Sequence, residues 1–250
     1  MLKLIKYEFR KQAFSKLVIL VCIGALELFF CYGVIADKQN VLALSTLFFM
    51  LFTMGAMCFI AFESIITYSN DLNQKCSYML FLTPNTTYSI VGAKVLTAGL
   101  QVILAGIVFL LIFAINGGIL IARYDALEYV REQILKLLEQ LFQLKIQWKE
   151  VISFTIASIL SWINIITLAF FSITLSTTFL ANKKFKGFVS FLIFLLLYVG
   201  MSKILKLVGD NFIDYRNMSN AFLCVGFVTF IFIVLTYIGT AWMLDKKVSV

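Results

Sequence analysis

Residues 17–36 have the sequence LVILVCIGALELFFCYGVIA, a run of 20 residues with one charged side chain, Glu27. At 1.5 Å per residue, a helix of this length spans about 30 Å, the thickness of the hydrocarbon layer of a bilayer. Five more apolar runs follow it along the chain, at residues 41–66, 88–121, 151–180, 188–208 and 221–244. The sequence therefore predicts an all-α polytopic membrane protein with six transmembrane helices.

The composition supports this fold class and excludes several kinds of activity. The chain is 62% hydrophobic and 14% charged, whereas soluble domains average about a quarter charged residues. It contains no histidine, no glycine-rich phosphate loop and no HExxH motif. We therefore expect no catalytic site, no metal site and no cofactor bound by this chain.

The distribution of charge predicts the orientation. The N-terminus, the 67–87 loop with the adjoining Lys94, the 181–187 loop and the C-terminal tail together carry 12 of the 21 lysines and arginines. The same side carries only four acidic residues, namely Glu8, Glu63, Asp71 and Asp245. By the positive-inside rule, both termini are expected in the cytoplasm. The net charge of +8 is thus explained by topology, and no nucleic-acid partner is expected.

Residues 1–16 form a separate amphipathic segment. Leu2, Ile5 and Phe9 recur at helical spacing, and three basic residues recur at the same spacing one position along: Lys3, Lys6 and Arg10. A basic amphipathic helix is typical of segments that lie on the inner membrane surface. An ordinary cationic tail beside the membrane is the alternative.

Residues 122–150 interrupt the transmembrane pattern. Their apolar residues fall on an a/d heptad seam, and charged residues lie between them. The seam consists of Leu127, Val130, Ile134, Leu137, Leu141, Leu144 and Trp148. A helix with so many charges does not lie in lipid, so we predict an extracellular amphipathic helical insertion. It either forms a cap over the protein or lies flat on the outer leaflet.

Glu27 is the outstanding charge within a predicted span. Exposure of a carboxylate to lipid is unfavourable by several kcal/mol, so Glu27 is expected to face the bundle interior, a partner helix or a watery path. A role in translocation or gating is one interpretation. The alternative is a structural hydrogen bond to a Ser, Thr or Asn of another helix, such as Asn164 in the Ser/Thr-rich fourth span.

The only proline, Pro84, lies between the second and third spans. Proline favours the first position of a helix, and Thr83 before it suits the cap. We therefore predict that the second span ends near Thr67, that a short cytoplasmic helix covers residues 70–83, and that the third span starts after Pro84. The apolar residues of that short helix are Leu72, Cys76, Met79, Leu80 and Leu82.

This layout resembles the ABC-2 type permeases, the transmembrane subunits of bacterial ATP-binding-cassette exporters. The resemblance rests on a Leu-Thr-Pro turn followed by an Ile-Val-x-x-Lys start of the third span: Leu82, Thr83, Pro84, Ile90, Val91 and Lys94. It extends to the N-terminal amphipathic helix, the six spans and the cytoplasmic termini. The long 122–150 segment departs from the usual family outline and suggests the peptide-exporting members.

The resemblance implies a function and partners. The 70–83 helix would be the coupling helix, which docks on a cytoplasmic ABC ATPase present in two copies, and ATP and Mg²⁺ would bind to that subunit. Two copies of this chain in the bacterial plasma membrane would form the path for an amphipathic or hydrophobic substrate. A sensor or immunity subunit of a similar complex and an intramembrane enzyme are the alternatives.

Overall fold

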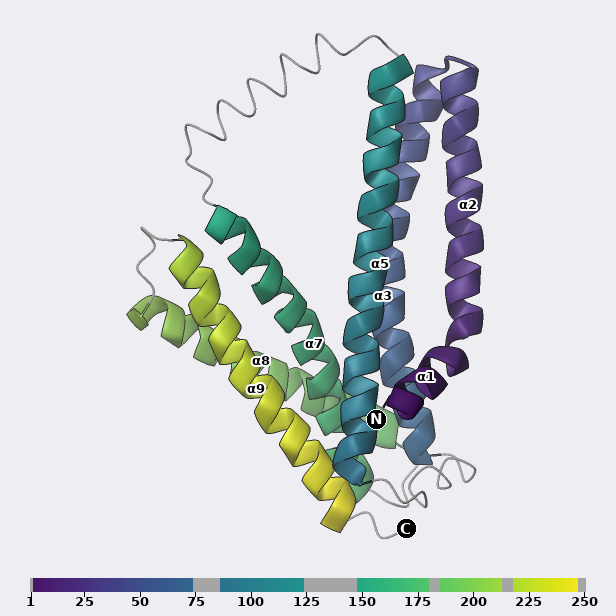
Figure 1. The fold of residues 1–250 in the computed structure, drawn as a ribbon. Coiled ribbons are helices and arrows are strands. Elements are labelled where there is room, and N and C mark those ends of the chain that lie inside the picture. Colours follow the sequence, from purple (N-terminus) through teal and green to yellow (C-terminus); the bar gives the residue numbers. More distant parts are fainter. Residues whose placement is uncertain (1, 74–85, 124–147, 180–184, 213–217, 247–250) are drawn as a thin grey trace. The chain divides into compact units, whose positions relative to one another are not determined.

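The computed structural model describes residues 2–73, 86–123, 148–179, 185–212 and 218–246, and the regular structure in these residues is helical (Figure 1). The helices are α1 (Leu2–Lys11), α2 (Ala13–Ile35), α3 (Gln39–Asn73), α5 (Thr87–Arg123), α7 (Trp148–Phe179), α8 (Lys186–Phe212) and α9 (Met218–Lys246). Six of them, all except α1, are long and apolar enough to cross a membrane. The predicted six long apolar helices are therefore confirmed, as expected for a polytopic helical membrane protein.

The ends of several helices differ from the predicted ones. Helix α3 continues to Asn73, so it does not end near Thr67. Helix α8 continues past Lys203 and Lys206 to Phe212. The predicted N-terminal segment contains α1 and the first turn of α2, because a helix break falls at Gln12.

The chain divides into two compact units, which are described separately. The three-helix unit consists of Phe9–Ile60 and Gln101–Ile146, and the α7–α9 unit consists of Met1–Glu8, Ala61–Leu100 and Gln147–Val250. Helices α1, α3 and α5 each contribute to both units.

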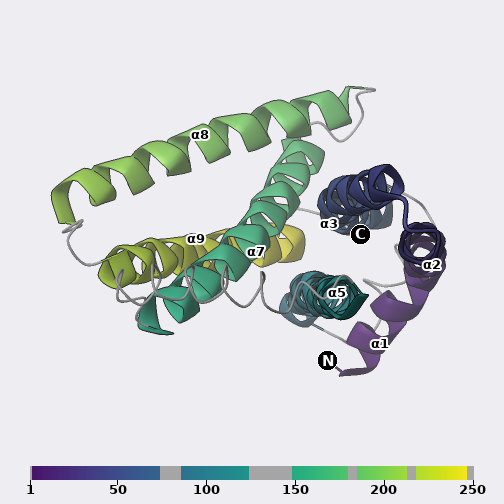
Figure 2. The same cartoon turned by 90° about the horizontal axis from the view of Figure 1, so that it is seen from above.

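In the three-helix unit, α2, α3 and α5 run beside one another (Figures 1 and 2). Their common core holds Ile23 of α2, Phe49 and Ala56 of α3, and Phe109 of α5. The rings of Phe49 and Phe109 meet edge to face with centroids 6.4 Å apart, a favourable aromatic arrangement.

A tight turn joins α2 to α3. Asp37 adopts a positive φ of 50°, a left-handed conformation that Asp tolerates better than most residues. The side chain of Leu42 packs against Gly33, where a Cβ atom would lie 3.1 Å from Leu42 Cδ2. The small residue at position 33 thus lets the end of α2 and the start of α3 approach each other closely.

In the α7–α9 unit, α7 packs against both α8 and α9 (Figure 2). The ring of Tyr68 on α3 stacks on Phe170 of α7 with centroids 4.1 Å apart. The core around this pair consists of Ala61, Tyr68, Ala98, Ile166, Phe170 and Ile173. This core joins the end of α3 and the start of α5 to α7.

The hydroxyl groups of α7 bond mainly within the helix. Thr167, Ser172 and Thr174 are buried, and each donates a hydrogen bond to a carbonyl oxygen three or four residues earlier. Ser176 is an exception, since its Oγ donates to the carbonyl of Lys186 at the start of α8, at 2.9 Å. Most hydroxyl groups of α7 therefore donate their hydrogen bonds within the helix, and few of them bond to a neighbouring helix.

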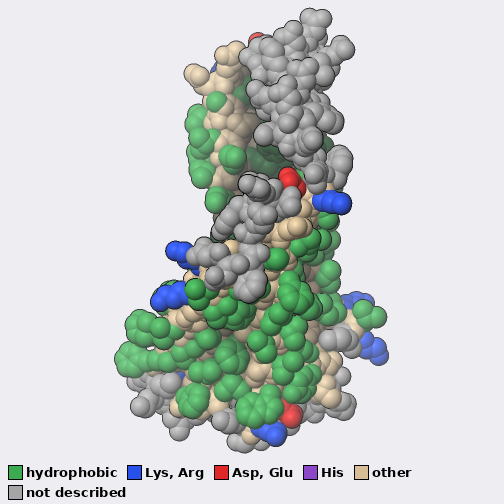
Figure 3. Space-filling model, turned by 90° about the vertical axis from the view of Figure 1, so that its left-hand side faces the viewer, with side chains coloured by type: hydrophobic (Ala, Val, Ile, Leu, Met, Phe, Trp, Pro, Cys, Tyr) green, Lys and Arg blue, Asp and Glu red, His purple; other side chains and the backbone are tan. Residues whose placement is uncertain are grey.

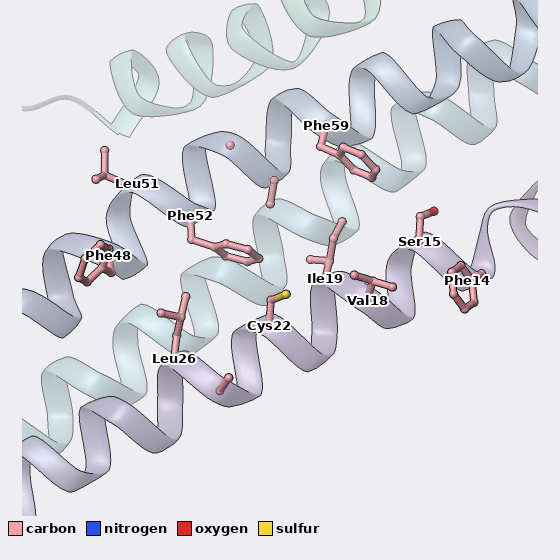
Figure 4. Close-up of a pocket in the computed structure, with 13 residues that line it drawn as sticks. Phe14, Ser15, Val18, Ile19, Cys22, Leu26, Phe48, Leu51, Phe52 and Phe59 are labelled. Atoms are coloured by element: carbon pink, nitrogen blue, oxygen red, sulfur yellow. The ribbon is translucent and has the colours of Figure 1, made fainter.

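Hydrophobic side chains cover much of the surface of the described helices (Figure 3). Leu28 and Leu196 are both more than 70% exposed, as expected for residues in contact with lipid. An apolar groove of about 1060 Å³ also runs between α2 and α3, with side chains from both helices along it (Figure 4). Exposure of this kind is compatible with a bilayer and unfavourable in water.

The predicted extracellular insertion lies largely outside the described residues. Helix α5 reaches Arg123 and α7 begins at Trp148.

We predict that the contact between α7 and α9 depends on Gly239. A Cβ atom at this position would lie 2.8 Å from Cε2 of Phe171, too close for two carbon atoms. Gly239→Ala should therefore lower stability by about 1–3 kcal/mol, the typical effect of overpacking. The matched control is Gly200→Ala on α8, where a Cβ atom meets nothing within 4 Å.

The measurement is the thermal unfolding midpoint of each purified variant in the same detergent. Gly200→Ala should leave the midpoint unchanged or raise it slightly, because Ala favours helix over Gly by about 1 kcal/mol. Equal midpoints for the two variants would contradict the close packing of Gly239.

Candidate functional site

Three buried charged residues meet where α1, α3 and α5 come together in the α7–α9 unit. The Nζ atom of Lys94 on α5 donates a hydrogen bond to Oε1 of Glu8 on α1 at 2.5 Å, and another to Oδ2 of Asp71 on α3. All three residues are at most 5% exposed. We call Glu8, Asp71 and Lys94 the ion cluster.

The ion cluster joins three segments that are distant in sequence. Burial of a single charge is strongly unfavourable, whereas a hydrogen-bonded pair compensates for much of the lost hydration. Lys94 has three N–H donors, so it can serve both carboxylates at once. Removal of the lysine would take the same ammonium group away from both buried carboxylates.

Other hydrogen bonds near the ion cluster hold the end of α3 and the start of α5 against α7 and α9. One turn before Asp71, the hydroxyl of Tyr68 lies 2.6 Å from Thr174 Oγ1 of α7. At the start of α5, Thr87 Oγ1 donates to Asp245 Oδ1 of α9 at 3.4 Å. The hydroxyl of Tyr237 on α9 donates to the carbonyl oxygen of Tyr88 at 2.8 Å.

These contacts bear on the segment between α3 and α5. Asp71 lies two residues before the last residue of α3, and Lys94 lies in the second turn of α5. Their hydrogen bond therefore closes the stretch of chain that contains the predicted coupling helix. Glu8 connects α1 to the same lysine, so Lys94 bonds both to the end of α3 and to the N-terminal helix.

Most of the predicted coupling residues lie outside the described residues: Cys76, Met79, Leu80, Leu82, Thr83 and Pro84. Leu72 is described, and it differs from the prediction. It belongs to the last turn of α3 and packs against the core cluster around Tyr68 and Phe170. Leu72 thus contributes to the core of this unit, in place of the apolar face of a separate short helix.

The basic residues of the predicted interfacial helix lie on the surface. Lys3, Lys6 and Arg10 are exposed on α1, whereas Glu8 is buried in the ion cluster. A basic exposed face is compatible with anionic lipid headgroups, and the buried Glu8 fixes the opposite side of the helix.

Glu27 has a hydrogen-bond partner within the three-helix unit. Asn116 of α5 donates from Nδ2 to Glu27 Oε1 of α2 at 2.9 Å. Of the two interpretations from sequence, the interhelical hydrogen bond is present, but its partner is Asn116 and not Asn164. Asn164 instead lies buried on α7 and donates to the Met201 sulfur at 2.8 Å.

Sequence reasoning did not recognise Glu8 and Asp71 as partners of Lys94. A signal was present, because both are acidic residues on the side of the chain that is otherwise strongly basic. Acidic residues retained there need a structural reason, and the most economical one is a buried cation. The pairing itself spans 86 residues in one case and was not accessible from local pattern.

Comparison with known proteins gives no relative. No family model matches the chain, and no curated protein or solved structure is significantly similar to it. Functional inference therefore rests on the residues and their geometry.

We predict that Lys94→Met destabilises the protein by about 3–5 kcal/mol, because it leaves two buried carboxylates without their cation. Glu8→Gln should cost less, about 1–2 kcal/mol, since the pair of Lys94 with Asp71 remains. The measurement is resistance to unfolding by SDS, with loss of helicity followed by circular dichroism.

The control is Lys203→Met, which removes an exposed lysine of α8. It should change the unfolding midpoint little. If Lys94→Met unfolds at the same SDS fraction as Lys203→Met, the ion cluster contributes nothing to stability.

Proposed function

We propose that this chain is the permease subunit of a bacterial ABC exporter of the ABC-2 type, located in the plasma membrane with both termini in the cytoplasm. The supporting observation is the ion cluster of Glu8, Asp71 and Lys94. It fixes both ends of the stretch that carries the predicted coupling segment, the arrangement needed if a motion imposed there is to reach the membrane helices.

The proposed coupling acts through the start of α5. An ATPase bound to residues 70–83 would push or pull on a segment whose two ends are tied together. Through Lys94 the displacement would reach α1, and through Tyr88 and Thr87 it would reach α9. A segment whose two ends are bonded to each other would move as one body and would displace the helices beside it. A loop with unconnected ends could change shape without moving those helices.

The proposed export path lies between two copies of the chain. Its cargo is an amphipathic or hydrophobic molecule, such as a peptide, in keeping with the apolar helices. Glu27 and Asn164 are proposed as polar residues of the path or its gate, and the 122–150 insertion as an extracellular elaboration of its exit. ATP and Mg²⁺ belong to the partner ATPase.

The test is a double substitution in the predicted coupling segment. Leu80→Asp with Leu82→Asp places two charges on an apolar docking surface, so the ATPase should no longer copurify with the chain. The expected loss of transport in membrane vesicles is about tenfold or more, since burial of an unpaired charge costs several kcal/mol. Both measurements require coexpression of this chain with the proposed partner, a cytoplasmic ABC ATPase.

The control adds the same charge at polar positions of the same segment, as Gln74→Asp with Ser77→Asp. It should leave copurification and transport near wild type. Copurification and transport by the Leu80/Leu82 variant at the control's level would refute the coupling assignment. If the wild-type chain copurifies with the ATPase but transports nothing, a sensor or immunity subunit would be favoured.

A further inference from the structure

A second polar site lies inside the three-helix unit. A cavity of about 770 Å³ opens between α2, α3 and α5, a size in the range of small-molecule sites. Its wall is mostly apolar and includes Phe30, Phe49, Phe109, Phe113 and Leu120. Glu27 and Asn116 are among the few polar residues that line it.

Both side chains line the cavity, and each carries oxygen atoms that can accept hydrogen bonds. Asn116 uses its Nδ2 donor on Glu27 Oε1, which leaves its Oδ1 atom to accept. Asn116 is 8% exposed, and Oδ1 is buried with no hydrogen-bond partner among the described residues. A buried amide oxygen without a donor is unfavourable, so a ligand N–H that reached this oxygen would be stabilised there.

Among the described residues, no lysine or arginine forms an ion pair with the Glu27 carboxylate. An ionised carboxylate within the membrane is favourable only beside a cation or several donors. Glu27 and Asn116 together therefore suit a group with a positive charge and more than one N–H.

From this geometry we infer that the cavity binds an amphiphilic primary amine. The ammonium group has three donors, enough for the Glu27 carboxylate and Asn116 Oδ1, and phenylalanine rings near a cation add further attraction. The alkyl or aromatic body of the ligand fills the apolar part of the cavity. The assignment of this ligand as exported cargo would rest on the proposed function, but its binding does not.

The test uses the full-length chain in lipid nanodiscs without any ATPase. The probe is dodecylamine with a photoreactive diazirine at the middle of its chain, and bound probe is counted by intact-protein mass spectrometry after illumination. Peptide mapping should place the label on cavity residues of α2, α3 or α5. Glu27→Gln should reduce labelling about tenfold or more, because a charge-assisted hydrogen bond is lost.

Two controls separate the effect of the charge from changes in folding and from partitioning of the probe into lipid. Glu63→Gln removes a carboxylate of α3 that does not line the cavity, and it should label like wild type. The uncharged analogue, dodecanol with the same diazirine, should label wild type weakly and should not distinguish Glu27→Gln from it. Thermal unfolding of each variant confirms that it is folded.

A second variant tests the cavity with both polar groups intact. A Cβ atom at either Gly117 or Gly118 meets nothing within 4 Å, but only Gly117 lines the cavity. Gly117→Phe should block labelling by the amine, and Gly118→Phe should not. Equal labelling of wild type and both Glu27→Gln and Gly117→Phe, or equal labelling by the amine and the alcohol, would overturn the inference.

Discussion

A lysine with two carboxylates, buried together, is the interaction on which the rest of the α7–α9 unit depends. Lys94 holds Glu8 of the N-terminal helix and Asp71 at the end of α3, and none of the three is more than 5% exposed. Charges buried in this way are tolerated only as a group, because each would be strongly unfavourable alone. The positions of α1, α3 and α5 within this unit are therefore linked, and a shift of one imposes a cost on the other two.

Most hydroxyl groups of α7 follow a different rule. Thr167, Ser172 and Thr174, for example, donate hydrogen bonds to carbonyl oxygens of their own helix. Glu27 and Asn116 depart from this rule, since they bond across two helices and face a cavity. The same chain thus uses local bonds where it needs an inert membrane helix and long-range bonds where it needs a specific site.

The sequence was sufficient to predict the six membrane helices, because length and hydropathy determine them without knowledge of packing. It was not sufficient to predict the partners of the charges. The hydrogen bond of Glu27 could have gone to Asn164 or Asn116, both amides within apolar runs, and only the packing of α2 beside α5 decides between them. The end of α3 was predicted too early because its last two turns carry several polar residues, one of which, Asp71, is buried beside Lys94.

The distance between α3 and α5 beside the ion cluster tests this account most directly. Spin labels at Ile66 and Leu96, both exposed residues of the α7–α9 unit, would report it in a background without the five native cysteines. Double electron–electron resonance in nanodiscs should give one narrow distance distribution for the otherwise unchanged chain and a broad one after Lys94→Met. The same narrow distribution in both proteins would contradict the claim that Lys94 holds the two helices together.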